Sequence, residues 1–199
     1  MRVVAGELRG RRIESPEGRG VRPTMDKARQ ATFNALGSLG LVAGARMADC
    51  FAGTGALGIE AISRGAAHVT FIERERAMLE VLHRNLAALG IADRATVLRG
   101  DAVAHVRGLR DVDVVLADPP YEYDDWAELL DAVPAAFVVA ESDREVQAPE
   151  GWETVRAKRY GRAWVTFLRR IGGGDEGGRV GGGAEGGRVG GGGGAGAVP

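Results

Sequence analysis

The sequence predicts one α/β domain with a mostly parallel sheet and helices on both of its faces. Short apolar runs alternate with helical patterns along most of the chain, and this alternation is typical of strand–helix–strand units. A glycine-rich turn follows the first main strand, and residues 152–160 and 162–170 read as two strands joined at Gly161. The closing hairpin should add an antiparallel edge. The 199 residues are enough for one sizeable core.

The N-terminal region predicts a short strand pair followed by a helix. Residues 3–6 and 11–14 resemble two short strands around a glycine-bearing turn. A helix should begin near Thr24, which can cap it, and Asp26 suits the positive first turn. One face of this helix is expected to carry Met25, Ala28, Thr32, Leu36 and Leu39.

The remaining elements follow from apolar periodicity. Strands are expected at 45–51, 68–73, 95–100, 113–118 and 136–142, before the two closing strands. Helices are expected at 56–63, 76–89 and 124–132, with a short one after Asp101.

The last part of the chain, from residue 172, repeats the unit GGGxEGGRV and continues as plain glycine. It has no periodic apolar face, so we expect a disordered tail. The predicted organisation is therefore a basic N-terminal strand pair over residues 1–22, a main domain over 23–170 and a glycine-rich tail over 171–199.

Charge is distributed unevenly, although the formal net charge is only −1. Residues 1–30 carry eight Arg or Lys against four acids, and residues 154–170 carry six Arg or Lys and no acid. This pattern fits either a polyanion footprint or two solvated charged segments. Candidate phosphate contacts are Arg11, Arg12, Arg22, Lys27 and Arg29.

The residues with metal-binding or disulfide chemistry are few. Cys50 is the single cysteine, which excludes a disulfide framework, and the three histidines show no ligand spacing. No apolar run approaches the roughly 20 residues of a membrane span, and no signal-peptide core is present. We therefore expect a cytoplasmic protein without a bound metal, and we take a monomer as the default oligomeric state.

A cofactor site is predicted after the first main strand. Gly53, Gly55 and Gly58 form a GxGxxG before a helix, and Glu73 ends the next strand, where an acid can bind ribose hydroxyls. This pair fits a nicotinamide enzyme or an S-adenosylmethionine enzyme. Asp101, which could reach an adenine amino group or simply cap a helix, favours the second, as does the lack of room for a separate substrate domain.

The sequence Asp118-Pro119-Pro120-Tyr121 ends another buried strand. Each proline fixes its own φ and lacks an N–H, so the corner is stiff and rich in acceptors. A fixed carboxylate, bare carbonyls and an aromatic ring suit a flat ligand that carries an amino group. The alternative is a rigid structural turn.

Taken together, these motifs resemble one family. RGRRI, RPTMDKAR, DCFAGTGALGIEAISRGAAHVTFIE, NLAALG, LADPPY and KRYG appear in the order found in the bacterial 16S rRNA guanine-N2 methyltransferases, over roughly residues 1–170. The resemblance implies the Rossmann-like class I fold, a seven-stranded sheet with one antiparallel strand, and S-adenosylmethionine as cofactor. It also implies 16S rRNA, or a small-subunit assembly particle, as substrate.

The resemblance implies roles for particular residues. Asp49, Gly53 and Gly55 would hold the methionine part of the cofactor, Glu73 the ribose and Asp101 the adenine. Asp118 and the Pro119 carbonyl would accept hydrogen bonds from the guanine amino group, Pro120 would keep the corner rigid, and Tyr121 would stack on the base. The residues also leave open another amino-group substrate, a nicotinamide-dependent oxidoreductase and a non-catalytic RNA-binding module.

Overall fold

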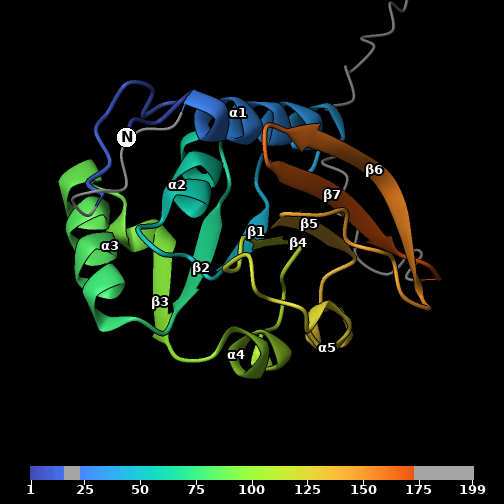
Figure 1. The fold of residues 1–199 in the computed structure, drawn as a ribbon. Helices are drawn as coiled ribbons and strands as arrows, with labels where there is room; N and C mark the ends of the chain where they lie inside the picture. Colours follow the sequence, from blue (N-terminus) through green and yellow to red (C-terminus); the bar gives the residue numbers. More distant parts are fainter. Residues whose placement is uncertain (16–22, 173–199) are drawn as a thin grey trace, which may run out of the picture.

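The structure is a computed structural model that describes residues 1–15 and 23–172, with side chains from residue 26 onward in the second range. Arg22 and the predicted glycine-rich tail therefore lie outside the described residues, as do the side chains of Thr24 and Met25. In the part that is described, helices pack on both faces of one twisted sheet (Figure 1).

The sheet has seven strands in the order β3-β2-β1-β4-β5-β7-β6. Neighbouring strands from β3 to β5 are parallel, whereas β7 runs antiparallel to both of its neighbours. The closing hairpin thus places the last strand inside the sheet and leaves β6 at the edge. The strands are β1 (Arg46–Cys50), β2 (His68–Glu73), β3 (Ala95–Arg99), β4 (Val114–Ala117), β5 (Phe137–Ser142), β6 (Trp152–Tyr160) and β7 (Ala163–Arg170).

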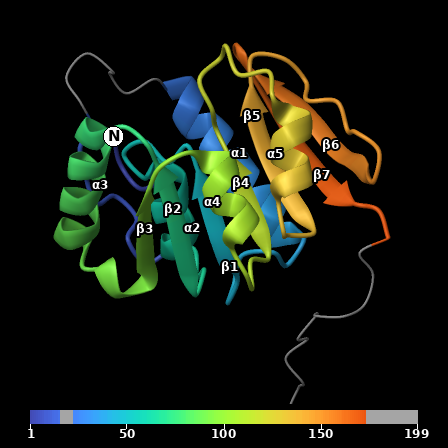
Figure 2. The ribbon, with the colours of Figure 1, turned by 90° about the horizontal axis from the view of Figure 1, so that it is seen from below.

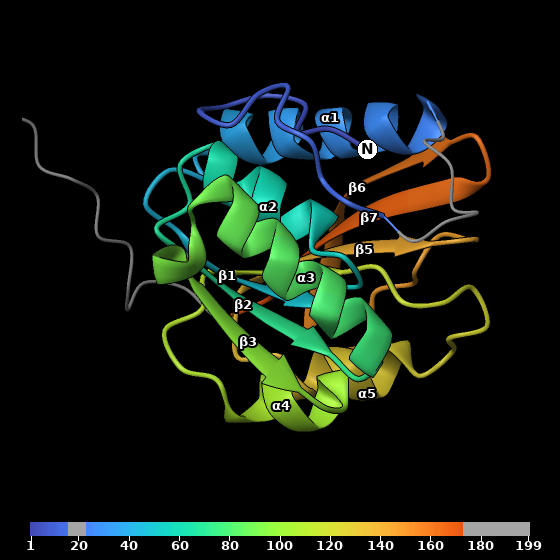
Figure 3. The same cartoon turned by 90° about the vertical axis from the view of Figure 1, so that its left-hand side faces the viewer.

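The two faces of the sheet carry different helices. Helices α1 (Pro23–Ser38), α2 (Ala56–Ser63) and α3 (Arg76–Leu89) cover one face, and α4 (Ala102–Gly108) and α5 (Trp126–Ala132) cover the other. Figure 2 shows α4 and α5 in front of the sheet, and Figure 3 shows α2 and α3 against the opposite face. A short 3-10 helix, Ala92–Arg94, precedes β3. The predicted fold class is confirmed.

Each face buries its own apolar cluster. Alternate residues of one strand belong to different clusters: Met47 packs with the α1–α3 side, and its neighbour Ala48 with the α4–α5 side. This alternation is the period-two pattern expected of a strand that is buried on both faces. It also fixes which side chains emerge together at the end of each strand.

The expected N-terminal strand pair is wrong in form. The two segments do pair, but only through one antiparallel bridge between Arg2 and Arg12, with hydrogen bonds from the Val3 N–H to the Arg11 carbonyl and from the Ile13 N–H to the Met1 carbonyl. Other backbone groups of this region bind α2: the Val4 and Ala5 N–H groups donate to Glu60, and the Leu8 N–H donates to the Ser63 hydroxyl. Side chains of α2 thus supply the acceptors that a partner strand would otherwise supply.

The apolar face of α1 is confirmed in its middle and wrong at its end. Ala28, Thr32 and Leu36 are buried, but Leu39 is 50% exposed. Leu39 follows the last helical residue, and Gly40 with φ 71° turns the chain away. The periodic pattern therefore extended one residue past the helix.

Candidate active site

Four carboxyl groups emerge together at the carboxyl ends of adjacent parallel strands. Glu73 ends β2, Asp49 lies near the end of β1, Asp118 follows β4, and Glu141 lies near the end of β5. The residue two positions before each of them packs in the α1–α3 cluster, so all four point to that face of the sheet. We call these four residues the acidic row. Open α/β folds bind ligands at this edge of the sheet.

Asp49 holds the glycine loop against the sheet. It is 1% exposed, and its Oδ2 accepts a hydrogen bond of 2.8 Å from the Gly58 N–H near the start of α2. Burial raises the pKa of Asp49 to about 7, and the neighbouring Asp118 and Glu73 carboxyl groups add to this rise. Asp49 therefore fixes the position of α2 relative to β1.

The three positions of the loop require glycine for different physical reasons. A Cβ on Gly55 would lie 2.4 Å from Leu82 Cδ1, and one on Gly58 would lie 2.2 Å from Phe71 Cε1. These two glycines are needed for helix packing. Gly53 has φ 54° and no atom within 4 Å of a Cβ, so its surface is open to a ligand.

Glu73 organises the same loop from the next strand. Its Oε2 accepts from the Gly53 N–H and its Oε1 from the Glu75 N–H, each at 2.7 Å. The carboxylate is 9% exposed, so its direction is fixed before any ligand arrives. Each oxygen keeps a lone pair that can accept a hydroxyl proton.

Asp101 lies at the N-terminus of α4 and is exposed. Its Oδ1 accepts a hydrogen bond of 3.0 Å from the Ala104 N–H, so its expected role as a helix cap is confirmed. The other carboxylate oxygen has no hydrogen-bond partner in the described residues.

The structure places Asp118-Pro119-Pro120-Tyr121 at the same edge, directly after β4. Asp118 is half-buried and forms no hydrogen bond or ion pair with a described residue, and burial raises its pKa to about 6. The Pro119 carbonyl likewise receives no hydrogen bond from a described residue, whereas the Pro120 carbonyl accepts from the Tyr123 N–H at 2.9 Å. Tyr121 is 47% exposed. The corner thus offers two unpaired acceptors, one on half-buried Asp118 and one on buried Pro119, beside an exposed aromatic ring.

Two neighbours of this corner carry signals that sequence reasoning missed. Phe51 has φ 63°, an unusual conformation for a residue with a side chain, and such residues are concentrated at functional sites. Its ring meets Tyr123 edge-on at 5.2 Å, and Tyr123 meets Trp126 at 5.4 Å. These contacts join the end of β1 to the loop after β4. Tyr123 and Trp126 therefore act here as packing residues.

Glu141 is the other residue that the sequence analysis did not single out. Ala117 pairs with Ala140, so Glu141 lies directly beside Asp118 on the next strand. Burial raises the pKa of Glu141 to about 8, Asp118 raises it further, and Arg29 opposes the rise. Its carboxyl group has no hydrogen-bond partner among the described residues. The only sequence signal was an acid near the end of an apolar run, FVVAES.

The proposed phosphate contacts fall into two groups. Arg11, Arg12 and Lys27 are exposed, although Arg11 also donates to the Ala88 carbonyl at 2.7 Å. Arg29 is a correction, because it is 5% exposed and its guanidinium binds Asp26 at 2.8 Å and lies 3.7 Å from buried Glu60. Its positive charge is needed inside the protein, because it partly neutralises the buried carboxylate of Glu60.

Two further observations concern classes of site. Within residues 1–15 and 23–172, no group of three or more His, Cys, Asp or Glu side chains is arranged to hold a metal ion. In the same described ranges, none of the helices combines the length and hydropathy that crossing a bilayer requires.

The sheet order, the glycine loop and the acidic row define a class I methyltransferase fold. The chain belongs to the family described as Conserved hypothetical protein 95, whose model matches residues 1–169.

Two similar proteins align with most of this chain and with most of their own length. Ribosomal RNA small subunit methyltransferase D of Escherichia coli K12 is 34% identical over 187 residues, which are 88% of this chain and 92% of the relative. The enzyme of the same name from Haemophilus influenzae is 30% identical over 174 residues, which are 81% of this chain and 89% of the relative.

Solved structures agree with this fold. The yhhF protein of Escherichia coli superposes with a TM-score of 0.74 at 34% identity, covering 85% of this chain and 97% of that one. A hypothetical protein of Thermus thermophilus superposes with a TM-score of 0.69 at 25% identity, covering 85% of this chain and 99% of that one.

Proposed function

We propose that this protein transfers a methyl group from S-adenosylmethionine to the exocyclic N2 amino group of a guanine in small-subunit rRNA. The observation that carries the proposal is the pair of acceptors at Asp118 and Pro119 that have no hydrogen-bond partner among the described residues, at the same sheet edge as the glycine loop and Glu73. We further propose that the protein acts as a monomer on 16S rRNA or on a particle that contains it.

The two acceptors match what an aromatic amine requires. The lone pair of a guanine amino group is delocalised into the ring, so the nitrogen is a weak nucleophile. Hydrogen bonds from both N–H groups, to the Asp118 carboxylate and the Pro119 carbonyl, hold the nitrogen in place and localise the lone pair. The nitrogen becomes acidic as it is methylated, and Asp118 or water can take its proton.

The remaining residues of the corner serve the base. The prolines keep the acceptors rigid, since each has a fixed φ. Moving the guanine out of its base stack costs a few kcal/mol of free energy. Stacking of the base on Tyr121 would offset about 1–3 kcal/mol of this cost. The exposed ring of Tyr121 is available for this contact.

The glycine loop fits the cofactor that the fold implies. When bound, S-adenosylmethionine supplies a methyl group that is already activated by a sulfonium. Gly53 has the open surface that allows a close approach, Glu73 can accept from ribose hydroxyls, and the free oxygen of Asp101 can accept from an amino group. Gly55 and Asp49 act mainly by shaping the loop, and any direct contact they make would be through the backbone or one remaining lone pair.

The guanine of small-subunit rRNA is favoured by the two relatives named above, which are called small-subunit rRNA methyltransferases. A second amino-group substrate, a glutamine amide, has a weaker basis. Release factor glutamine methyltransferase of Moorella thermoacetica is 38% identical over 78 residues, but these are only 26% of that enzyme. The exposed basic residues of the N-terminal segment fit a nucleic acid better than a peptide.

Two experiments test the proposal in order. S-adenosylmethionine should raise the melting temperature and NADH should not, because a ligand stabilises the state that binds it. The protein should then add N2-methylguanine to small ribosomal subunits from a strain that lacks its own relative, as mapped by digestion and mass spectrometry. Methyl incorporation at an adenine, or into protein, would reject the guanine assignment; stabilisation by NADH alone would reject the methyltransferase assignment.

A further inference from the structure

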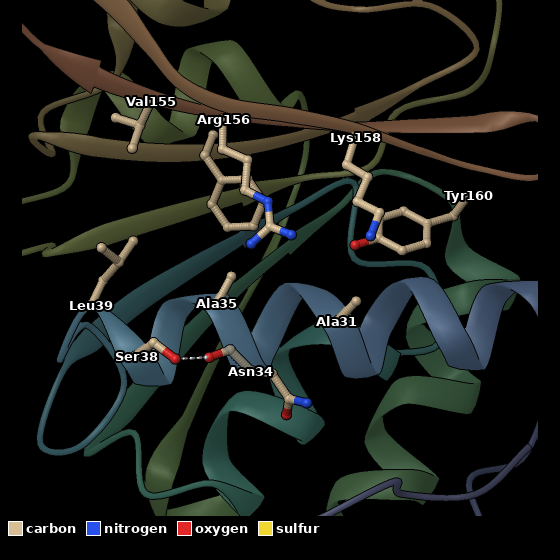
Figure 4. Close-up of a pocket in the computed structure, with 10 residues that line it drawn as sticks. Ala31, Asn34, Ala35, Ser38, Leu39, Val155, Arg156, Lys158 and Tyr160 are labelled. Carbon is tan, nitrogen blue, oxygen red and sulfur yellow. Dashed lines mark hydrogen bonds between the residues drawn. The ribbon is translucent and has the colours of Figure 1, made fainter.

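A groove runs between α1 and the edge strand β6, on the same face of the sheet as the acidic row. Its volume is about 470 Å³. Figure 4 shows side chains of β6 above the groove and side chains of α1 below it. The lining residues that matter here are Asn34, Ser38, Arg156, Lys158 and Tyr160.

The groove is positively charged. None of its lining residues is acidic, and Arg156 and Lys158 are both exposed. Neither side chain forms an ion pair or hydrogen bond with a described residue; Lys158 Nζ lies 5.5 Å from the centre of the Tyr160 ring. Two other arginines of the hairpin are already engaged: Arg169 pairs with Glu153, and Arg170 lies over Trp152 at 4.5 Å.

The strand register connects this groove to the acidic row. Lys158 pairs with Val165, Val165 pairs with Glu141, and Glu141 lies beside Asp118. With neighbouring strands about 4.8 Å apart, Lys158 lies three strand spacings, roughly 14 Å, from the amine-binding corner. Val165 belongs to the α1–α3 cluster, so this line of residues stays on one face of the sheet. Tyr160 ends β6 at the same edge as Asp118, and Arg156 lies further along the groove.

We propose that this groove binds the sugar–phosphate backbone of a single-stranded RNA segment next to the methylated base. Arg156 and Lys158 contact phosphates, and the Tyr160 ring contacts a ribose or a base. The proposal rests on the proposed function and adds a path for the substrate. A polyanion is the occupant that the charges favour, because two unpaired cations and no acid line the groove.

The test replaces both cations while keeping their polar character, in the variant Arg156→Gln/Lys158→Gln of the full chain. The probes are a short fluorescein-labelled single-stranded RNA and unmethylated small ribosomal subunits. We expect roughly tenfold weaker RNA binding and a similar rise in KM, with kcat and the S-adenosylmethionine-induced melting shift unchanged. The slope of log affinity against log salt concentration should fall by about 1.4, since each lost phosphate contact removes about 0.7.

The matched control is Arg107→Gln/Arg110→Gln. Arg107 lies in the last turn of α4, 4.0 Å from Asp131, and Arg110 lies just after this helix; both are exposed, α4 covers the opposite face of the sheet, and this variant removes the same amount of charge. The control should bind RNA as the wild type does. An equal loss in both variants would show a nonspecific charge effect and overturn the proposal.

Other outcomes separate this proposal from the proposed function. Wild-type RNA affinity and KM in the groove variant would overturn the groove. The groove variant could bind intact subunits more weakly but bind naked RNA as the wild type does. This result would indicate that the groove contacts a ribosomal protein, and it would overturn the RNA contact. The wild type could fail to methylate guanine while the groove variant still binds RNA more weakly than the wild type. In that case the proposed function would fail and the RNA-binding groove would stand.

Discussion

The two halves of the acidic row differ in what they bind. On the β1–β2 side, Asp49 and Glu73 accept backbone N–H groups of the glycine loop. On the β4–β5 side, Asp118 and Glu141 have no hydrogen-bond partner in the described residues. The first half is therefore built by the protein itself, whereas the second half keeps desolvated acceptors unused. Unpaired acceptors at a buried edge cost stability, and this is typical of a site that is completed by its ligand.

The largest expected effect comes from the unpaired half. Asp118→Ala removes one acceptor for the amino group, and we expect kcat to fall by about 10²- to 10³-fold, as for the loss of one donor to a developing charge. Cofactor affinity should stay near the wild-type value, because Asp118 does not hold the loop. Methyl incorporation and calorimetric titration with S-adenosylmethionine measure the two effects. Normal turnover in this variant would contradict the proposed role of the corner.

A matched pair of variants compares the halves directly. Glu73→Ala leaves the Gly53 and Glu75 N–H groups without an acceptor, so we expect a loss of about 1–3 kcal/mol of unfolding free energy and weaker cofactor binding. Glu141→Ala removes a desolvated carboxyl group without breaking a hydrogen bond, so it should leave stability equal or higher. Denaturant unfolding of both variants is the measurement. Equal destabilisation would mean that the halves do not differ as described.

The glycine loop offers a smaller contrast of the same kind. Gly58→Ala places a methyl group against Phe71 and should cost about 1–3 kcal/mol of stability through overpacking. Gly53→Ala meets no atom and should cost only about 1–2 kcal/mol for its left-handed φ, yet it should weaken cofactor binding more than its stability loss suggests. Thermal melts with and without S-adenosylmethionine distinguish the two. A normal ligand-induced shift in Gly53→Ala would show that nothing approaches this glycine.

The last comparison within the acidic row concerns the pH dependence of stability. Burial raises the pKa of Asp118 to about 6 and that of Asp49 to about 7, from an ordinary value of 3.8. The folded state then binds more protons than the unfolded state between about pH 4 and 7, so stability from these groups is full below pH 4 and is lost as pH rises through this window. In Asp118→Asn, the decrease in unfolding free energy near pH 6 should be smaller than in the wild type, as measured by denaturant unfolding at several pH values. An unchanged decrease in this variant would mean that a group other than Asp118 titrates in this pH range.

Local pattern was enough for most elements. The bounds of α2, β2, α3 and β6 coincide with the predicted ranges, because each has a complete apolar period bounded by turn residues or glycine. The position of Asp118 followed in the same way, since it comes directly after a buried run. The edge at which Glu73, Asp101 and Asp118 meet was also predictable, because parallel strands place their carboxyl ends together.

The sequence by itself thus determined the fold class, most element boundaries and the edge that carries the site. Tertiary structure decided the partners: that Arg29 faces Glu60, that the N-terminal segment binds α2, that Glu141 lies beside Asp118, and that β7 enters the sheet and leaves β6 to line a groove. Periodicity and turn chemistry act over a few residues, so they can be read from neighbours in the chain. Charge pairing, burial and strand order depend on residues tens of positions away, and only the folded chain brings these together.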